Sequence, residues 1–279
     1  MIIDKIKDKF EFLTKKQKQI ARYILSTDQE IAFLTISQLA RRCQISESSI
    51  VRFCRAIGYK GYPDLQKEFQ NVIREKLSPP EALQIIINKK SDDDIYSQTF
   101  ETDYKNLQKT RELNNNEKIE LAINEIIKAK RIGIMGFRSS HSVAYLLYFH
   151  LGQLRKNCDL LEFHMGGLPN HIVNYGPQDL LIGISLPRYS KQTLSCFKYV
   201  KKKKCKTIAI TDSTLSPIAQ EAHIVLLIGN RSCTYFNSLT SAVTLVNCII
   251  AGVSLKSKRS LETLKEVDGI VKEWGLLLT

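Results

Sequence analysis

Residues 36–62 read ISQLARRCQISESSIVRFCRAIGYKGY, and this stretch decides how the first part of the chain folds. Apolar residues recur at helical spacing in two segments, residues 36–43 and residues 47–56, which a short turn separates. Ala40 is small enough to let two helices cross closely. Gln44 occupies the turn position that glycine often holds, because that position usually takes a left-handed backbone. The stretch therefore predicts a helix-turn-helix whose turn is either strained at Gln44 or shaped differently.

The second helix of this motif has one apolar and one polar face. Ile50, Phe53 and Ile57 repeat at i, i+3 and i+7 and predict the buried side. The opposite side is basic and rich in hydroxyl groups, and in such motifs the N-terminal part of the second helix enters the major groove of DNA. An arginine there matches the paired acceptors of guanine or phosphate. The residues expected to contact DNA are Ser46, which is also expected to cap the helix, Ser48, Ser49, Arg52, Arg55, Lys60 and Tyr62.

The composition agrees with a nucleic-acid partner but does not select it. The chain has 279 residues and a net charge of +13, which favours a polyanion, either nucleic acid or an anionic membrane. No segment is long and apolar enough to span a bilayer, and the N-terminus lacks the apolar core of a signal peptide, so we expect a cytoplasmic protein. The seven cysteines contain no C-x-x-C pair. Those inside apolar patterns, such as Cys54, Cys205 and Cys248, are expected to be buried free thiols.

The helix-turn-helix is expected to belong to an all-helical domain that covers residues 1–77. The last helix of this domain begins near Pro63 and is stopped by Ser78-Pro79-Pro80. Residues 78–117 are expected to form a linker and a connecting helix. The pattern leaves open whether that helix, from about residue 98 to residue 113, packs on the second domain or pairs with a partner chain.

In residues 118–279 the pattern changes to apolar strands that alternate with helices. The strands are expected at residues 131–136, 159–163, 179–185, 206–211 and 223–228. Such alternation predicts a parallel sheet that helices cover on both faces. Five strands fit a flavodoxin-like, doubly wound order better than a full dinucleotide-binding fold. The whole chain is therefore expected to be an α + α/β protein.

Two loops of this second domain carry groups that bind anions. The first follows the first strand and opens a helix, where free backbone N–H groups favour an anion. The second follows the third strand, and loops at the carboxyl ends of neighbouring parallel strands line one crevice. The first loop lacks the G-x-G-x-x-G spacing, so a dinucleotide is not expected. The residues expected to bind the ligand are Arg138, Ser139, Ser140, Ser185, Arg188, Tyr189 and Ser190.

Both parts of the chain resemble a known family. The sequence LTKKQKQIARYIL together with the helix-turn-helix, and above all its IVRFCRAIGYKGY portion, is similar to the N-terminal domain of RpiR-type bacterial transcriptional regulators. The later part resembles the sugar isomerase (SIS) domain that forms the second half of that family. The resemblance covers nearly the whole chain. It implies a DNA-binding regulator whose SIS domain binds phosphosugars through the hydroxyl groups of its loops.

The ligand loops depart from the SIS pattern at three positions. SIS domains typically show G-x-G-x-S in the first loop and S-x-S-G-x-[ST] in the second. Here Arg138 stands in place of a glycine, and Pro187 and Arg188 replace a serine and a glycine. The two arginines can bind a phosphate or carboxylate bidentately, or they can fill the space that a sugar needs. A phosphosugar and another small anion are therefore both compatible with the sequence.

Other interpretations compete with a ligand-controlled regulator. An aldose–ketose isomerase needs a base beside its substrate, and His141 in the first loop is the best candidate, although a hydrogen-bonding role is favoured for it. Glu162 and His164 have no spacing that marks an acid–base pair or a metal site. A SIS domain that only oligomerises the protein is a further interpretation. The lysines at residues 201–204 are interpreted as a solvated helix end, where cations interact favourably with the helix dipole, rather than as a second DNA site.

The interpretation that we adopt is a transcriptional regulator that binds double-stranded DNA and senses a small anionic, phosphosugar-like metabolite. We expect no catalytic residue, no metal, no cofactor and no membrane partner. Helix-turn-helix proteins usually read two DNA half-sites as dimers. A homodimer or homotetramer is therefore expected, assembled at least partly through the second domain.

Overall fold

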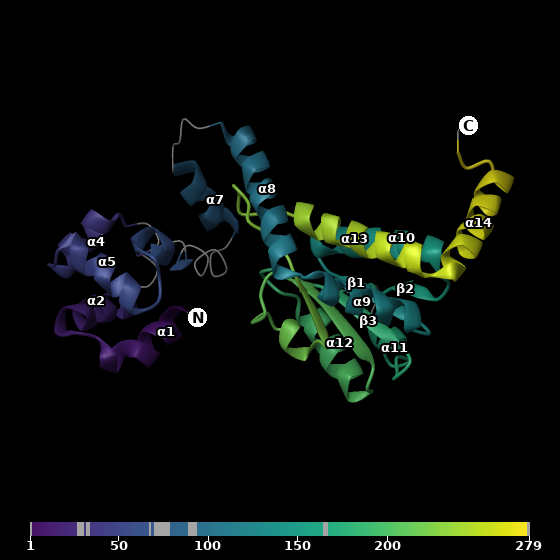
Figure 1. The fold of residues 1–279 in the computed structure, drawn as a ribbon, viewed down its shortest axis with the longest axis horizontal. Helices are drawn as coiled ribbons and strands as arrows, with labels where there is room; N and C mark the ends of the chain where they lie inside the picture. Colours follow the sequence, from purple (N-terminus) through teal and green to yellow (C-terminus); the bar gives the residue numbers. More distant parts are fainter. Residues whose placement is uncertain are drawn as a thin grey trace. The chain divides into compact units, whose positions relative to one another are not determined.

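The computed structural model describes residues 2–26, 31, 34–66, 68–69, 79–88, 94–163 and 167–277. Contacts divide the chain into two compact units, residues 1–90 and residues 91–279 (Figure 1). Each unit has an apolar core of its own. The first core lies among N-terminal helices, and the second lies on the faces of a parallel sheet.

The first unit is all-helical, as the sequence predicts. Its helices are α1 (Ile2–Lys9), α2 (Lys15–Ser26), α4 (Ile36–Cys43), α5 (Glu47–Ala56) and α7 (Pro79–Asn88), with a 3-10 turn η1 (Phe10–Phe12). The helix expected near Pro63 is present at residues 62–66, and its course beyond residue 69 lies outside the described residues. Ile20 of α2, Leu39 of α4 and Phe53 of α5 are fully buried in one cluster. The predicted helix-turn-helix is therefore confirmed.

The turn between α4 and α5 keeps a left-handed conformation although it lacks a glycine. Gln44 has φ 52° and ψ 46°. Its N–H donates to the carbonyl of Arg41 (3.1 Å), and the N–H of Ile45 donates to the carbonyl of Ala40 (3.0 Å). These two bonds satisfy the last carbonyls of α4 in the Schellman pattern. The turn thus has the geometry usual for the motif, and Gln44 bears the strain of the left-handed backbone.

The region expected as a linker, residues 78–117, is more structured than predicted. Helix α7 begins at Pro79, because proline suits the first turn of a helix. The two units divide after residue 90, so that α8 (Ile95–Leu113) belongs to the second unit. Helix α8 packs on α13 and β5 of its own unit, which agrees with the first of the two alternatives that the sequence left open.

The second unit contains a five-stranded, all-parallel sheet. Its strands are β1 (Ile132–Gly136), β2 (Cys158–Leu160), β3 (Leu180–Ile184), β4 (Lys206–Thr211) and β5 (Ile224–Leu227). They lie in the order β2-β1-β3-β4-β5. Ile132 pairs with Leu180, and Leu180 pairs with Lys206, so the first residues of β1, β3 and β4 lie side by side in the register of the sheet. The predicted flavodoxin-like order is confirmed.

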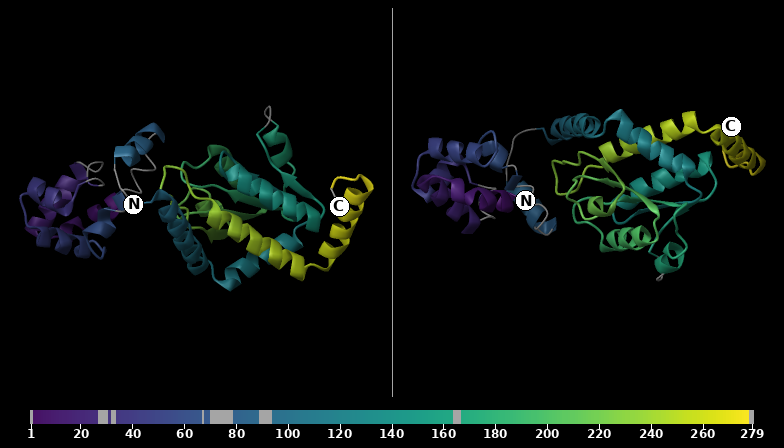
Figure 2. Two further views of the ribbon diagram at one scale, coloured as in Figure 1. Left: turned by 90° about the horizontal axis from the view of Figure 1, so that it is seen from above. Right: turned by 60° about the horizontal axis from the view of Figure 1, so that its bottom comes forward.

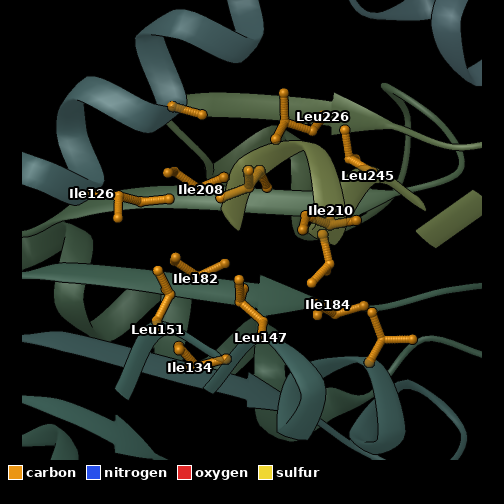
Figure 3. Packing of buried hydrophobic residues seen from close by; sticks show 14 of the residues in the cluster. Ile126, Ile134, Leu147, Leu151, Ile182, Ile184, Ile208, Ile210, Leu226 and Leu245 are labelled. Atoms are coloured by element: carbon orange, nitrogen blue, oxygen red, sulfur yellow. The ribbon is translucent and has the colours of Figure 1, made fainter. Parts of the chain in front are cut away.

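Helices cover both faces of this sheet. They are α9 (Asn116–Lys128), α10 (Ser140–Leu154), α11 (Leu168–Ile172), α12 (Lys191–Lys202) and α13 (Thr240–Lys256), with a 3-10 turn η2 (Ala219–Glu221). Helix α14 (Lys258–Glu273) packs on α10 and α13. Figure 1 and Figure 2 show α10 and α13 on one side and α12 on the other. On the first side, Ile134, Ile182 and Ile210 pack with Leu147 (Figure 3). On the second side, the strands pack against α11, α12 and η2.

Helix α8 pairs with the edge of the sheet through its side chains. Asn114 accepts from the N–H of Leu227 (2.8 Å) and donates to the carbonyl of the same residue (2.6 Å). Thr110 Oγ1 accepts from the N–H of Gly229 (2.8 Å), and Asn106 bonds to both backbone groups of Arg231 (2.7 and 3.1 Å). Four residues of helix rise about 6 Å, and two residues of strand rise about 6.6 Å, so the two spacings match. The helix thereby satisfies backbone groups that an edge strand leaves unpaired.

The cysteines of the chain are free thiols. Cys54 and Cys205 are buried, but Cys248 is exposed on α13, so the prediction for that residue is wrong. Among the described residues, no group of three His, Cys, Asp or Glu side chains could hold a metal. Within the described parts of the chain, no single helix is long and apolar enough to cross a membrane. The bent pair formed by residues 240–256 and 259–273 meets that test by length and composition alone.

Candidate functional site

One surface of α5 carries the exposed polar residues that the sequence singled out. Ser48, Arg52 and Arg55 are exposed, whereas Ile50 and Phe53 of the same helix are fully buried. Arg52 Nε donates to the carbonyl of Ser48 (3.3 Å), so its side chain lies along the first turn of α5. The exposed face of α5, which consists of Ser48, Arg52 and Arg55, is called the reading face below.

The three serines at the start of α5 form a hydroxyl cluster. Ser46 occupies the N-cap position, but its hydroxyl makes no capping bond. Its Oγ lies 3.0 Å from Ser48 Oγ and 2.9 Å from Ser49 Oγ. Ser49 is buried because it lies four residues before Phe53 and therefore shares its inward side. The predicted capping bond of Ser46 and the predicted exposure of Ser49 are thus wrong, and Ser46 and Ser48 are the hydroxyls that reach solvent.

Of the two residues expected to touch DNA just after α5, only one lies at the surface. Lys60 is exposed, and its N–H donates to Asp64 (3.3 Å). Tyr62 is 3 % exposed, and its hydroxyl donates to the carbonyl of Leu34 (2.7 Å). It belongs to the core that holds the residues before α4, which excludes the predicted contact of Tyr62 with the DNA backbone.

Two contacts position α5 relative to its neighbours. Lys9 Nζ of α1 donates to the carbonyl of Ala56 (3.2 Å) at the end of α5, where a cation also suits the helix dipole. Ser37 of α4 donates to Glu47 Oε1 (2.5 Å) at the beginning of α5. Glu47 is exposed beside the reading face and did not enter the sequence prediction. A carboxylate at this place can accept from cytosine in the major groove.

The second unit holds a cavity of about 210 Å³ at the carboxyl ends of its strands. Its lining residues come from three loops and are Phe137, Arg138, Ser139, Ser140, Ser185, Leu186, Pro187, Arg188, Ser190, Tyr235, Phe236 and Asn237. Sites for drug-sized ligands usually have volumes of about 300–1,000 Å³, so this cavity is small. A small polar metabolite is therefore a better fit than a dinucleotide.

Six of the seven predicted ligand residues meet at this cavity. Ser140 and Ser185 are buried within its wall. Ser190 is the N-cap of α12, and its hydroxyl accepts from the N–H of Thr193 (3.3 Å). Both arginines have left-handed backbones, with φ 58° at Arg138 and φ 72° at Arg188. SIS domains typically carry glycine at both positions, and the structure gives the reason, since only glycine adopts such φ values without strain.

Tyr189 is the exception among the predicted ligand residues. Its hydroxyl donates to Asp212 Oδ1 (3.0 Å) at the end of β4, and it is not among the residues that line the cavity. Burial raises the pKa of Asp212, while the bond from Tyr189 opposes that shift. Tyr189 therefore holds the second loop against β4, and the prediction that it faces the ligand is wrong.

The third loop of the cavity was missed by sequence reasoning. Tyr235, Phe236 and Asn237 follow β5, and Phe236 is 62 % exposed. Asn237 Nδ2 donates to the carbonyl of Pro187 (3.4 Å), which ties this loop to the second one. The loop after β5 is rich in hydroxyl residues, which is a signal that could have pointed to it, but β5 is separated from β3 by β4, so strand adjacency does not predict its position.

Acid–base groups are absent from the described lining of the cavity. No His, Asp or Glu occurs among the residues of that lining. His141, the candidate base, has its Nε2 3.4 Å from Glu162 Oε1. His164 lies outside the described residues. The arrangement of the described lining is suited to hold an anion by hydroxyl, guanidinium and backbone N–H groups, and it offers no proton acceptor of the kind that isomerisation requires.

Comparisons with known proteins cover both units. Residues 1–76 match the helix-turn-helix domain of the rpiR family, and residues 125–251 match the SIS domain. A helix-turn-helix transcriptional regulator of Haemophilus influenzae is 28 % identical over 238 residues, which are 82 % of this chain and 80 % of that protein.

Solved structures add two similar proteins. The sugar isomerase domain of an RpiR transcription factor from Sphaerobacter thermophilus is 30 % identical, with a TM-score of 0.61, and the match covers 63 % of this chain and 99 % of that chain. The NanR protein of Vibrio vulnificus, solved in complex with ManNAc-6P, matches over 100 % of both chains with a TM-score of 0.61 and 20 % identity, which is a likeness of fold.

Proposed function

Because the chain belongs to the RpiR family of helix-turn-helix transcriptional regulators with a SIS domain, we propose that it binds operator DNA through the reading face of α5 and that an anionic, phosphosugar-like metabolite in the cavity controls this binding. The proposal of DNA binding rests on the exposure of Ser48, Arg52 and Arg55 together on one side of α5, whose other side is buried. The observation that supports the second half is the convergence of six predicted anion-binding residues on one cavity.

A route from the cavity to the DNA-binding unit supports the control. The cavity loop that contains Asn237 continues into Ser238 and Thr240, and their hydroxyls donate to the carboxylate of Asp103 on α8 (2.5 and 2.6 Å). Asn106 of the same helix also bonds to the backbone after β5. Helix α8 is the first described element of the second unit and follows the connection from the first. A ligand that reorders the loop would therefore change the contacts of α8, the helix nearest in sequence to the first unit.

We further propose that the protein works in the cytoplasm as a homodimer or homotetramer assembled partly through its second unit. Two half-sites of an operator require two reading faces. Tyr96, Phe100 and Tyr104 recur every four residues on α8 and are 78 %, 81 % and 57 % exposed, an apolar stripe that a second subunit could cover. Light scattering of the full chain measures the assembly directly, and a monomer at micromolar concentration would exclude this part of the proposal.

The DNA-binding half is tested by fluorescence anisotropy with duplexes from the region flanking its own gene and with random duplexes at matched salt. Arg52→Ala should lower the preference for the specific duplex by about 5–150-fold, the usual range for a lost base contact. Arg111→Ala removes the same charge from an exposed position on α8 and serves as the control. Unchanged affinity and preference in Arg52→Ala would exclude the reading face.

The route through α8 has its own test. Asp103→Asn should leave ligand binding in the cavity intact while weakening the effect of ligand on DNA affinity, because the neutral amide holds Ser238 and Thr240 less strongly. Glu101→Gln makes the same charge change on the same helix, where Glu101 pairs only with Lys105 among the described residues. If the ligand changed DNA affinity equally in Asp103→Asn and Glu101→Gln, control through Asp103 would be excluded.

A further inference from the structure

The two arginines of the cavity stand at positions where the backbone disfavours them. A left-handed conformation is unfavourable for a residue with a side chain, and a glycine avoids this strain. Arg138 and Arg188 both adopt it, one in each of two neighbouring loops. Two independent strained positions that both place a guanidinium beside the same cavity indicate that the side chains serve the ligand.

Neither guanidinium is neutralised by the protein around it. Arg138 and Arg188 are the only charged residues of the described lining. The nearest strand-end carboxylate on β4, that of Asp212, accepts from Tyr189, and Glu162 faces His141. Within the described part of the chain, neither arginine has a carboxylate partner. The cavity therefore presents two uncompensated positive charges to whatever enters it.

The two arginines lie on separate loops that begin helices on opposite faces of the sheet. Arg138 precedes the first turn of α10, where Ser139 and the buried Ser140 lie, and Arg188 precedes the first turn of α12, which Ser190 caps. Each loop thus combines a guanidinium, a hydroxyl and a helix N-terminus, a set that suits one anionic group. Two such sets beside one cavity match a ligand with two anionic groups.

From this arrangement we propose that the cavity selects a phosphosugar that carries a second anionic group at its other end, either a carboxylate or a second phosphate. The inference rests on the proposed function, because it concerns the same cavity. It differs from that function in excluding a phosphosugar with a neutral head as the preferred ligand. The second guanidinium gains a charge-assisted partner only when the ligand has two acidic ends.

Isothermal titration calorimetry of the full chain tests this selection with three probes. They are glucose 6-phosphate, which has one acidic end, 6-phosphogluconate, which adds a carboxylate, and fructose 1,6-bisphosphate, which adds a phosphate. At least one of the two-ended probes should bind about tenfold tighter or more than glucose 6-phosphate. Which of them does so identifies the second group.

Glycine variants assign the selection to the arginines. Arg138→Gly and Arg188→Gly suit the left-handed backbone, so the fold should persist, and each should reduce the affinity for the preferred two-ended probe to that for glucose 6-phosphate. Lys204→Gly is the matched control, because Lys204 is also a basic residue with a left-handed backbone (φ 58°) but lies at the end of α12, outside the cavity. It should leave all three affinities unchanged.

The outcomes separate this inference from the proposed function. Equal affinity for the three probes, or the same discrimination in both arginine variants, would overturn the inference while the cavity still counts as a phosphosugar site. No binding of any probe at millimolar concentration would overturn the inference and the ligand half of the proposed function together.

Discussion

Replacing Asn114 with alanine removes the two hydrogen bonds that join α8 to the end of β5. Asn114 is 3 % exposed, and both backbone groups of Leu227 depend on it, at 2.8 and 2.6 Å. A buried backbone group left without a partner costs roughly 1–3 kcal/mol. Since water can reach part of a sheet edge after the truncation, two such groups should destabilise the second unit by about 3 kcal/mol. For a unit of this size, that corresponds to a fall in Tm of about 6–12 °C.

Calorimetric unfolding measures the loss, and hydrogen exchange locates it. In Asn114→Ala, the amide of Leu227 should exchange much faster, while amides of the central strand β3 should follow only the global change. Asn116→Ala is the control, because Asn116 is exposed two residues later in the chain. A change in Tm no larger than that of Asn116→Ala, with Leu227 still protected, would refute the claim that α8 completes the sheet edge.

Two further predictions concern the turn of the first unit and a histidine of the second. Gln44→Gly should stabilise the first unit by about 1 kcal/mol in chemical denaturation, because glycine relieves the strain of the left-handed backbone. Gln44→Ala keeps that strain and is the control. An equal gain of stability in Gln44→Ala would contradict this explanation. Burial together with Lys206 and Lys201 lowers the pKa of His223 below its ordinary value of 6.5, and its Nδ1 accepts from the N–H of Thr207 (3.1 Å). The stability that the neutral ring contributes is therefore present above pH 6.5 and is lost as the pH falls through the lowered pKa. Acid unfolding curves of His223→Asn should show a smaller loss of stability in this pH range than those of the unchanged protein. Identical curves would argue against this role of His223.

Much of the fold follows from local patterns of the sequence. Ile50, Phe53 and Ile57 identify the buried side of α5 because their spacing admits only one helical face. The strand of residues 206–211 is predicted at its observed bounds, since an apolar run between a lysine cluster and Thr211-Asp212 has clear ends. The order of the strands follows from their number and from the helices between them.

What the sequence did not predict depends on contacts between distant segments. In the sequence, a polar stripe on a helix is all that marks Asn106, Thr110 and Asn114. Their partners lie in the backbone at and after the end of β5, which is 113 to 125 residues away in the sequence. Tyr62 follows the exposed Lys60 in a polar stretch that suggests a surface position, yet its ring is buried and its hydroxyl bonds to Leu34, 28 residues away in the sequence. The loop at residues 235–237 reaches the cavity across β4, and no spacing rule brings it there.

The central claim is that an anion in the cavity of the second unit changes the affinity of the first unit for DNA. The most direct measurement is an anisotropy titration of the operator duplex with the full chain, with and without 6-phosphogluconate, at a concentration for which calorimetry gives a filled cavity. We expect a shift in the Kd for DNA of about tenfold, which corresponds to about 1.4 kcal/mol of coupling. The same Kd with the cavity filled and with the cavity empty would contradict it.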